Sequence, residues 1–173
     1  KSLSDLSSKK NTFLYFVEKG DDLKSVADQF NIPYEVIPVT RQNKEEMEAI
    51  EFEILDRYEI DFIVLAGYML LIDDDMLQAY DKRIVNIHPS LLPKYGGKGM
   101  HGDKVHQAVV AAQDTESGIT IHYLNERYDE GDVVFQAVCE VLPADTPDDV
   151  AAKVHALEYE WYPKVVEKLV ANL

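Results

Sequence analysis

Short apolar runs alternate along this chain with longer segments of helical periodicity, and this alternation restricts the possible folds more than any other feature. The runs at 61–65 (DFIVL) and 83–87 (RIVNI) are largely apolar, as is typical of strands covered on both faces of a sheet. Apolar residues recur with helical spacing in the predicted helices 21–31, 43–58, 73–80, 104–112 and 146–172. Strands and helices in alternation predict an α/β fold with a mostly parallel sheet.

Further segments have the β-branched and aromatic composition of strands, and these are residues 11–17, 34–39, 118–124 and 133–141. Pro38 lacks a backbone N–H, so we expect the strand that contains it to lie at an edge of the sheet. A short polar loop separates the last two strands, which can therefore pair antiparallel. Thr146 and Pro147 are suited to the N-cap and the first turn of the last helix.

Composition narrows the classes of protein to which the chain can belong. The 173 residues suffice for one domain, and the formal net charge of −15 would repel nucleic acid, so an anionic substrate would need a local positive site. No apolar run approaches the roughly 18 residues of a membrane span, and no signal peptide is visible. The single Cys139 excludes an internal disulfide, and zinc-type Cys/His spacing is missing, which indicates a reduced, cytoplasmic compartment.

Asn86 and His88 lie two residues apart at the end of a predicted strand, so both side chains point to the same face of the sheet. Ligands of open α/β sheets bind beyond the carboxyl ends of the strands. Pro89 restricts His88 to an extended backbone. The pair could donate hydrogen bonds to one oxygen, and a histidine can also transfer a proton near neutral pH. Asn and His after a strand often make loop hydrogen bonds instead, so the pair alone leaves both interpretations open.

A second polar group follows later in the chain. His122 lies in a predicted strand, and Asp129 follows in a loop of polar residues. A carboxylate beside an imidazole would raise the pKa of the imidazole and fix its orientation. Asp129 alone could equally be a solvated loop residue. The constellation fits acyl or formyl transfer, and it also fits a binding site for a polar small molecule.

The segments NIHPSLLPKY (86–95) and GITIHYLNERYDEGDVVFQ (118–136) resemble the 10-formyltetrahydrofolate-dependent formyltransferases. The likeness extends from about residue 21 to the C-terminus. It implies a Rossmann-like formyltransferase fold, with 10-formyltetrahydrofolate as cosubstrate and no metal. Within the family, it implies the branch that formylates the amine of glycinamide ribonucleotide in purine biosynthesis, as a monomer or a homodimer.

The resemblance assigns roles to the polar groups. It implies that Asn86, His88 and Asp129 are catalytic: Asn86 and His88 stabilise the oxyanion, and Asp129 assists proton movement through His88 or water. His122 would lie behind them, although a histidine satisfied within its strand is as common. The family often has a cis bond before the proline that matches Pro93.

The resemblance also implies binding residues. The folate would lie along 66–72 and the loop that carries Asp129, with contacts from Met69, Leu70, Leu71, Ile72, Asn125, Glu126, Arg127 and Tyr128. Ordinary core packing is the alternative for 69–72. Some relatives carry Arg where this chain has Leu70. Glu158 would bind the glycinamide substrate, although an exposed helical Glu is common, and Lys94, Arg83 and Lys98 are candidates for anion contacts.

The N-terminal part departs from the family pattern. Family members begin with a strand and a Gly/Ser/Asn-rich loop that holds the substrate phosphate at a helix N-terminus. Residues 1–10 (KSLSDLSSKK) have no such strand and loop before them. We therefore expect residues 1–173 to be a single formyltransferase domain, truncated at its N-terminus, that lacks the first strand and the phosphate loop and binds glycinamide ribonucleotide poorly.

Two other activities stay open at this point. Residues 21–46 resemble formyltetrahydrofolate deformylase, a relative that transfers the formyl group to water, whereas Pro89, Leu91 and Gly67 fit the transferase pattern. Sugar-amine formyltransferases are a more distant possibility. The missing phosphate loop also allows a folate-binding domain without catalytic activity.

Overall fold

The computed structural model describes residues 23–37, 44–68 and 70–173. Its contacts divide the chain into two compact units, Lys1–Val39 and Thr40–Leu173. All residues of the predicted catalytic group belong to the second unit. The prediction of one domain over residues 1–173 stays a prediction.

The described part of the first unit contains one helix, α1 (Leu23–Phe30), as the sequence predicts. Asn31 ends this helix in the left-handed region (φ 53°), and the N–H of Ile32 donates to the carbonyl of Ala27 at 2.9 Å. The strand predicted from Tyr34 is wrong for residues 34–37, which form no strand. Pro33 removes one backbone donor there, and described residues 23–37 offer no neighbouring strand to pair with. Residues 38 and 39 and the predicted strand 11–17 lie outside the described residues.

The second unit is built on a four-stranded sheet of β1 (Ile63–Leu65), β2 (Ile84–His88), β3 (Glu116–Tyr123) and β4 (Val133–Glu140), paired in that order. All four strands were predicted near these bounds. β1 and β2 are parallel, whereas β2–β3 and β3–β4 are antiparallel. The described sheet is therefore mixed, and the prediction of a mostly parallel sheet fails at β3. The helix between β2 and β3 packs on α5 and does not carry the chain back along the sheet, so β3 runs against β2.

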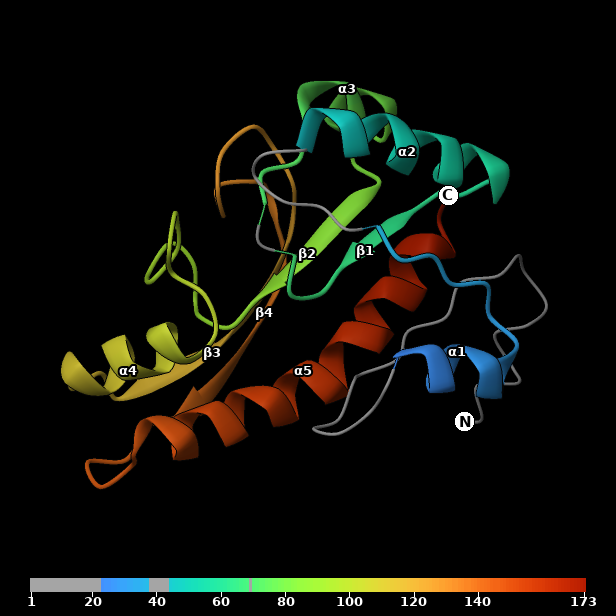
Figure 1. The fold of residues 1–173 in the computed structure, drawn as a ribbon. Helices are drawn as coiled ribbons and strands as arrows, with labels where there is room; N and C mark the ends of the chain where they lie inside the picture. The colour runs from blue at the N-terminus through green and yellow to red at the C-terminus, as the bar shows by residue number, and fades with distance from the viewer. Residues whose placement is uncertain (1–22, 38–43, 69) are drawn as a thin grey trace. The chain divides into compact units, whose positions relative to one another are not determined.

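Four helices flank this sheet: α2 (Lys44–Arg57), α3 (Asp74–Ala79), α4 (Asp103–Ala111) and α5 (Pro147–Val170). Each begins and ends within two residues of its predicted bounds. The start of α5 follows from its sequence, because Thr146 and Asp149 form a reciprocal capping box and Pro147 occupies the first turn. Figure 1 shows α5 running along one side of the sheet, with α2 and α3 on the other.

Alternation along the strands sends apolar side chains into two separate clusters. Ile84 packs with Met76 of α3 and with residues of α2, on one face of the sheet. Ile87 points to the opposite face, where Ile119 and residues of α4 and α5 form the other cluster. Asn86 and His88 share the face of Ile84, at the end of β2.

Among the helices of the described residues, none is long and apolar enough to cross a membrane. The same part of the chain contains no group of three or more His, Cys, Asp and Glu side chains placed to hold a metal ion.

Candidate active site

The end of β2 and the facing part of β3 bring Asn86, His88 and His122 together. In the antiparallel register Asn86 lies opposite His122 and His88 opposite Thr120. Opposed residues point to the same face of a sheet, so all four side chains lie on one surface. The Asn86 Nδ2 and His122 Nε2 atoms are 3.4 Å apart. His88 and His122 are almost fully buried.

Asp129 completes this group from the loop between β3 and β4. Its Oδ1 lies 3.5 Å from His88 Nδ1 and 3.7 Å from His122 Nε2, while its Oδ2 accepts the N–H of Gly97 at 2.8 Å. The residue has a left-handed backbone (φ 57°), which Asp tolerates better than most residues. Gly131 lets the loop close on β3, because a Cβ at this position would lie 1.8 Å from the carbonyl oxygen of Tyr123.

Two backbone carbonyls fix the tautomers of the histidines. His88 Nε2 lies 2.8 Å from the carbonyl oxygen of Tyr95, and His122 Nδ1 lies 2.9 Å from that of Tyr123. A carbonyl only accepts, so these two nitrogens carry the hydrogens. The remaining nitrogens, His88 Nδ1 and His122 Nε2, both face Asp129 Oδ1. The carboxylate and the two imidazoles are therefore placed to share a proton.

Burial lowers the pKa of His122 below its ordinary value, and the opposing effects of the bond to Tyr123 and of the Asp129 charge do not offset it. The Asp129 carboxylate does act to raise the pKa of this imidazole, as we expected, but desolvation by burial is the larger effect and the net shift is downward. His122 is therefore neutral, and its Nε2 accepts a hydrogen bond from the Asn86 amide. This contact orients Asn86.

Thr120 fastens the loop after β2 to the sheet. Its fully buried hydroxyl donates to the carbonyl of Ser90 at 2.6 Å and accepts from the N–H of Leu92 at 2.9 Å and from Gln136 Nε2 at 2.8 Å. The peptide bond between Leu92 and Pro93 is cis, as the resemblance implies. The loop beside the predicted catalytic group is thus held to β3 by the hydrogen bonds of Thr120.

The predicted folate residues are divided between the core and the surface. Ile72 packs with Met76 and Ile84 in the core, as in the alternative of ordinary packing, so only its backbone could meet a ligand. Leu70 and Leu71 are half-buried, and Met69 lies outside the described residues. The structure therefore offers two partly exposed side chains of this segment for contact with a ligand.

The second predicted folate segment forms the loop that leads to Asp129. The side chain of Asn125 accepts the N–H of Arg127 at 2.9 Å, and the Arg127 guanidinium lies 3.1 Å from Glu130. Glu126 and Tyr128 are exposed. The loop thus has internal order while its outer side chains face solvent, and their role in folate binding stays a prediction.

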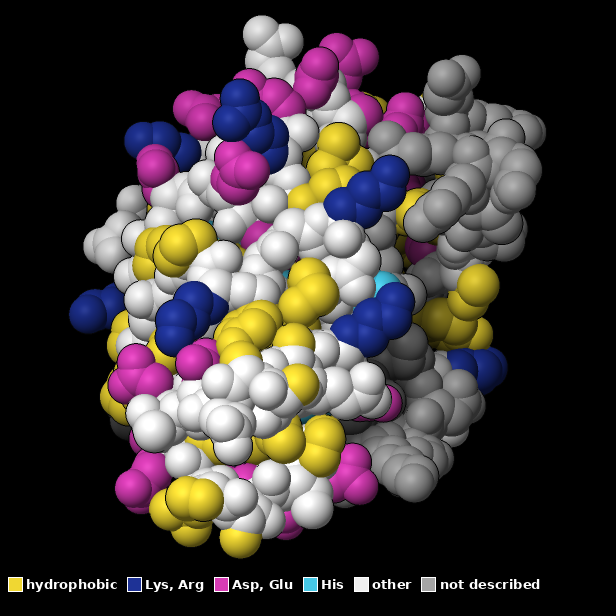
Figure 2. Space-filling model, turned by 90° about the vertical axis from the view of Figure 1, so that its left-hand side faces the viewer, with side chains coloured by type: hydrophobic (Ala, Val, Ile, Leu, Met, Phe, Trp, Pro, Cys, Tyr) yellow, Lys and Arg dark blue, Asp and Glu magenta, His cyan; other side chains and the backbone are white. Residues whose placement is uncertain are grey.

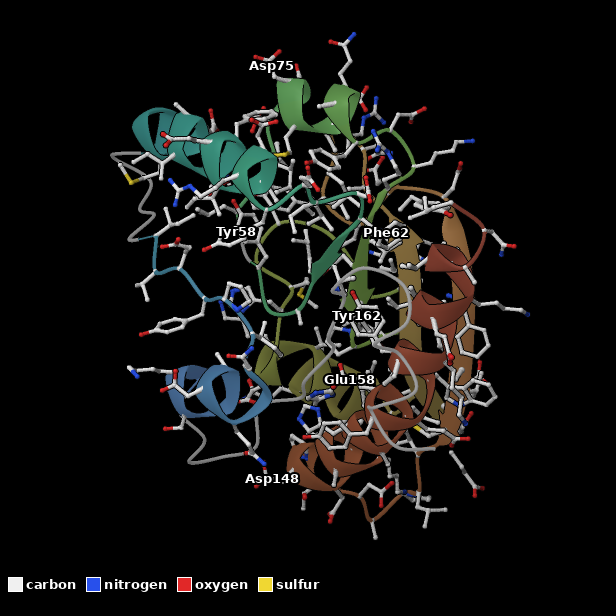
Figure 3. The ribbon with its side chains drawn as sticks, turned by 90° about the vertical axis from the view of Figure 1, so that its right-hand side faces the viewer. Tyr58, Phe62, Asp75, Asp148, Glu158 and Tyr162 are labelled. Atoms are coloured by element: carbon white, nitrogen blue, oxygen red, sulfur yellow. The ribbon has the colours of Figure 1, made fainter. Side chains whose placement is uncertain are left out.

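The two predicted substrate residues both have protein partners. Glu158 Oε2 lies 2.7 Å from His155 Nδ1 on the same helix, and its side chain is 16% exposed. Figure 3 shows Glu158 one turn before Tyr162 on α5. Lys94 Nζ lies 3.2 Å from Asp114 Oδ2, with a largely exposed side chain. A substrate could still bind Glu158 or Lys94, but it would have to share that side chain with His155 or Asp114.

The surface on the side of these loops has a mixed charge. Figure 2 shows Lys and Arg side chains lying singly, with acidic side chains above and below and hydrophobic ones across the centre. Because the net charge is −15, binding of an anion at this surface would depend on such local cations.

Sequence reasoning missed several residues that hold the site. Tyr95 and Gly97 contact His88 and Asp129 through backbone atoms, which no side-chain pattern reveals. Thr120 could have been found, because it precedes His122 by two residues in a strand and so shares its face.

Comparison with known proteins identifies the class to which this fold and site belong. The model of the formyl transferase family matches residues 7–166. The chain belongs to the formyl transferase family.

Several individual relatives are named phosphoribosylglycinamide formyltransferase. The chain is 39% identical over 145 residues to the phosphoribosylglycinamide formyltransferase of Bacillus subtilis, covering 83% of this chain and 72% of the relative. It is 46% identical over 114 residues to the chloroplastic enzyme of the same name from Arabidopsis thaliana, covering 66% of this chain and 39% of the relative. The crystal structure of the Bacillus halodurans protein of that name superposes with a TM-score of 0.76 at 34% identity, covering 88% of this chain and 77% of that one.

A second activity occurs among the relatives. The chain is 36% identical over 137 residues to a formyltetrahydrofolate deformylase from Synechocystis, covering 79% of this chain and 46% of the relative. The chain spans less than half the length of this deformylase and of the Arabidopsis relative.

Proposed function

We propose that the chain transfers the formyl group of 10-formyltetrahydrofolate to the amine of glycinamide ribonucleotide, a one-carbon transfer of purine biosynthesis. The observation that carries this proposal is the convergence of four side chains at the end of β2: His88 and His122 both face Asp129 Oδ1, and Asn86 contacts His122. Relatives named for this reaction, at 39% and 46% identity, support the choice of substrates.

Asn86 supplies the donor for the oxyanion in this mechanism. One N–H of its amide points to His122 Nε2, and its second N–H is the donor that we assign to the formyl oxygen. When the amine attacks the formyl carbon, negative charge develops on that oxygen and the hydrogen bond strengthens. Because neutral His122 orients the amide beforehand, little reorganisation is needed as the charge forms.

His88 and Asp129 hold the protons. Both nitrogens of His88 have partners in the structure, because Nε2 donates to the Tyr95 carbonyl and Nδ1 faces Asp129 Oδ1. We therefore assign His88 an electrostatic role during the reaction: a proton that reaches Nδ1 pairs with Asp129 and places a positive charge near the oxyanion. The new C–N bond leaves the attacking amine with an excess proton, which Asp129 accepts through His88 or water. The proton then passes to the folate nitrogen as its bond to the formyl carbon breaks.

The substrate contacts follow the family resemblance. We place the folate against Leu70, Leu71 and the loop 125–128, and the amine substrate near Glu158 and Lys94. No metal takes part in this proposal. The single cysteine suits a reducing, cytoplasmic compartment, and we expect a monomer or a homodimer.

The proposal is tested by incubating the protein with 10-formyltetrahydrofolate, with and without glycinamide ribonucleotide, and following the folate absorbance and the formylated product. We expect turnover that depends on the amine substrate. A rate that is the same without the amine would contradict the proposal and favour the deformylase.

The deformylase is the second candidate, and the 36% identity to the Synechocystis enzyme is the observation that favours it. The same polar group could activate water in place of an amine. A third possibility is a folate-binding domain without catalysis. Calorimetry measures folate binding directly. Binding of the folate without turnover, both with and without the amine, would support the third candidate and contradict both enzymatic activities.

A further inference from the structure

One short segment of backbone binds both His88 and Asp129, each through the atom that points away from the other residue. In the segment 94–97, the carbonyl of Tyr95 accepts the hydrogen of His88 Nε2, and two residues later the N–H of Gly97 donates to Asp129 Oδ2. The inner atoms, His88 Nδ1 and Asp129 Oδ1, face each other at 3.5 Å. The distance within this pair therefore depends on where the segment lies.

The segment does not hold its shape through backbone preference. Tyr95 has a left-handed backbone with φ 54°, a region that is unfavourable for an aromatic residue. Such a conformation persists only where the surroundings determine it. The contacts of the Tyr95 side chain must therefore fix the position of its carbonyl.

The phenol of Tyr95 is anchored outside the site. Its hydroxyl donates to Asp114 Oδ2 at 2.9 Å, and its ring packs against the core cluster around Val109. Asp114 lies in the turn after α4. Its pKa is lowered by the hydrogen bonds from Tyr95 and Lys94, so it is an ionised and strong acceptor. Tyr95 therefore connects Asp114, after α4, to His88: its hydroxyl binds Asp114 and its carbonyl binds His88.

We propose that Tyr95 is a positioning residue whose hydrogen bond to Asp114 fixes the carbonyl that selects the Nε2–H tautomer of His88 and aims its Nδ1 at Asp129. This inference rests on the proposed formyl transfer for its kinetic consequences. Its structural content, the tautomer of His88, stands independently of the reaction.

Tyr95→Phe tests the anchor because it removes only the hydroxyl oxygen. We expect kcat to fall about tenfold and KM to change by less than about threefold, since a misplaced catalytic group lowers the rate more than it weakens binding. Asp114→Ala should give the same loss, and the double variant should be no worse than either, because both changes break one interaction. Asp114→Asn keeps an acceptor for the hydroxyl and should restore most of the rate.

Tyr80→Phe is the matched control. Its hydroxyl also donates a hydrogen bond, in this case to the backbone carbonyl of Ile60 at 3.1 Å. Tyr80 caps the end of α3 and packs against the apolar cluster of Ile72, Met76 and Ile84. We expect its kcat, KM and histidine spectra to equal those of the native protein.

The ¹⁵N chemical shifts of the imidazoles give a readout that needs no turnover. The protein has five histidines, so the signals of His88 can be assigned by difference from His88→Gln. We expect the Nε2–H pattern for His88 in the native protein and Tyr80→Phe, and a mixture of tautomers in Tyr95→Phe and Asp114→Ala.

The outcomes separate this inference from the proposed function. If the native protein shows no formyl transfer, the function fails, and the imidazole spectra still decide the role of Tyr95. Unchanged His88 signals in Tyr95→Phe would overturn the inference, whatever the rate. A raised KM with an unchanged kcat would also overturn it, because it would mean that the segment contacts substrate instead of positioning His88.

Discussion

At the scale of single residues, Asp129 is the carboxylate that both imidazoles of the site face. One carboxylate oxygen faces two imidazole nitrogens and the other is held by the Gly97 N–H. Its left-handed backbone is one that Asn also adopts readily. An amide can therefore replace this carboxylate without a change in the loop.

Asp129→Asn should lower kcat by on the order of 10²–10⁴-fold, because the amide can neither hold the proton nor stabilise protonated His88. Steady-state kinetics with both substrates measure the loss, and circular dichroism checks the fold. Asp132→Asn makes the same change at an exposed position of the same loop and should retain the native rate. A rate for Asp129→Asn within a few-fold of native would contradict the assigned role.

At the scale of elements, the packing of α4 on α5 contains an unusual polar group. His106 is 2% exposed, and its Nδ1 is buried without a hydrogen-bond partner. The His155 ring lies 6.2 Å away, centroid to centroid, in an edge-on orientation. Burial first, and then His155, lowers the pKa of His106, while Asp103 opposes these effects. The neutral imidazole is therefore the form that fits between these helices.

This arrangement predicts a loss of stability in acid. As the pH falls below the ordinary histidine pKa of about 6.5, unfolded His106 binds a proton and folded His106 does not, so the free energy of unfolding decreases down to the lowered folded pKa. His106→Leu should be more stable than the native protein by about 1 kcal/mol at pH 8, because an unsatisfied buried nitrogen is removed. The difference should widen as the pH falls below about 6.5.

Urea unfolding at several pH values measures this effect. His106→Gln separates the two causes, because it removes the titration and keeps a buried polar group. The free energy of unfolding of His106→Gln should lack the pH dependence that His106 contributes. At pH 8 it should not rise above that of the native protein. Parallel stability curves for native and His106→Leu proteins would show that protonation of His106 does not affect folding.

At the scale of the whole second unit, Tyr162 joins α5 to the two parallel strands. Its fully buried hydroxyl lies 2.7 Å from the carbonyl of Leu65 in β1 and 3.3 Å from that of Val85 in β2. Burial and then Glu158 raise the pKa of this phenol, so it stays protonated and able to donate. Figure 3 shows the side chain directed from α5 toward these strands.

Tyr162→Phe should lower the free energy of unfolding by about 1–3 kcal/mol, because it removes the buried hydroxyl that donates to the carbonyl of Leu65. Urea unfolding measures the change. Tyr128→Phe, at an exposed position, should stay within about 0.5 kcal/mol of the native protein. An equally small effect for Tyr162→Phe would mean that packing alone holds α5 to β1 and β2.

Local patterns predicted the helices and strands of the second unit because their signals lie within a few residues. The N-cap at Thr146 and the apolar runs of β1 and β2 are such signals, and both are confirmed. The segment 34–37 shows the limit, since composition suited a strand but a strand needs a partner that composition does not supply.

The sequence by itself determined that Asn86 and His88 share one face at the end of a strand, because side chains alternate with a period of two. Only the tertiary structure decided that β3 runs antiparallel to β2 and so sets His122 opposite Asn86. It also decided that the Tyr95 carbonyl and the Gly97 N–H hold His88 and Asp129. Strand register and backbone hydrogen bonds between distant segments depend on packing across the whole unit, which no local pattern records.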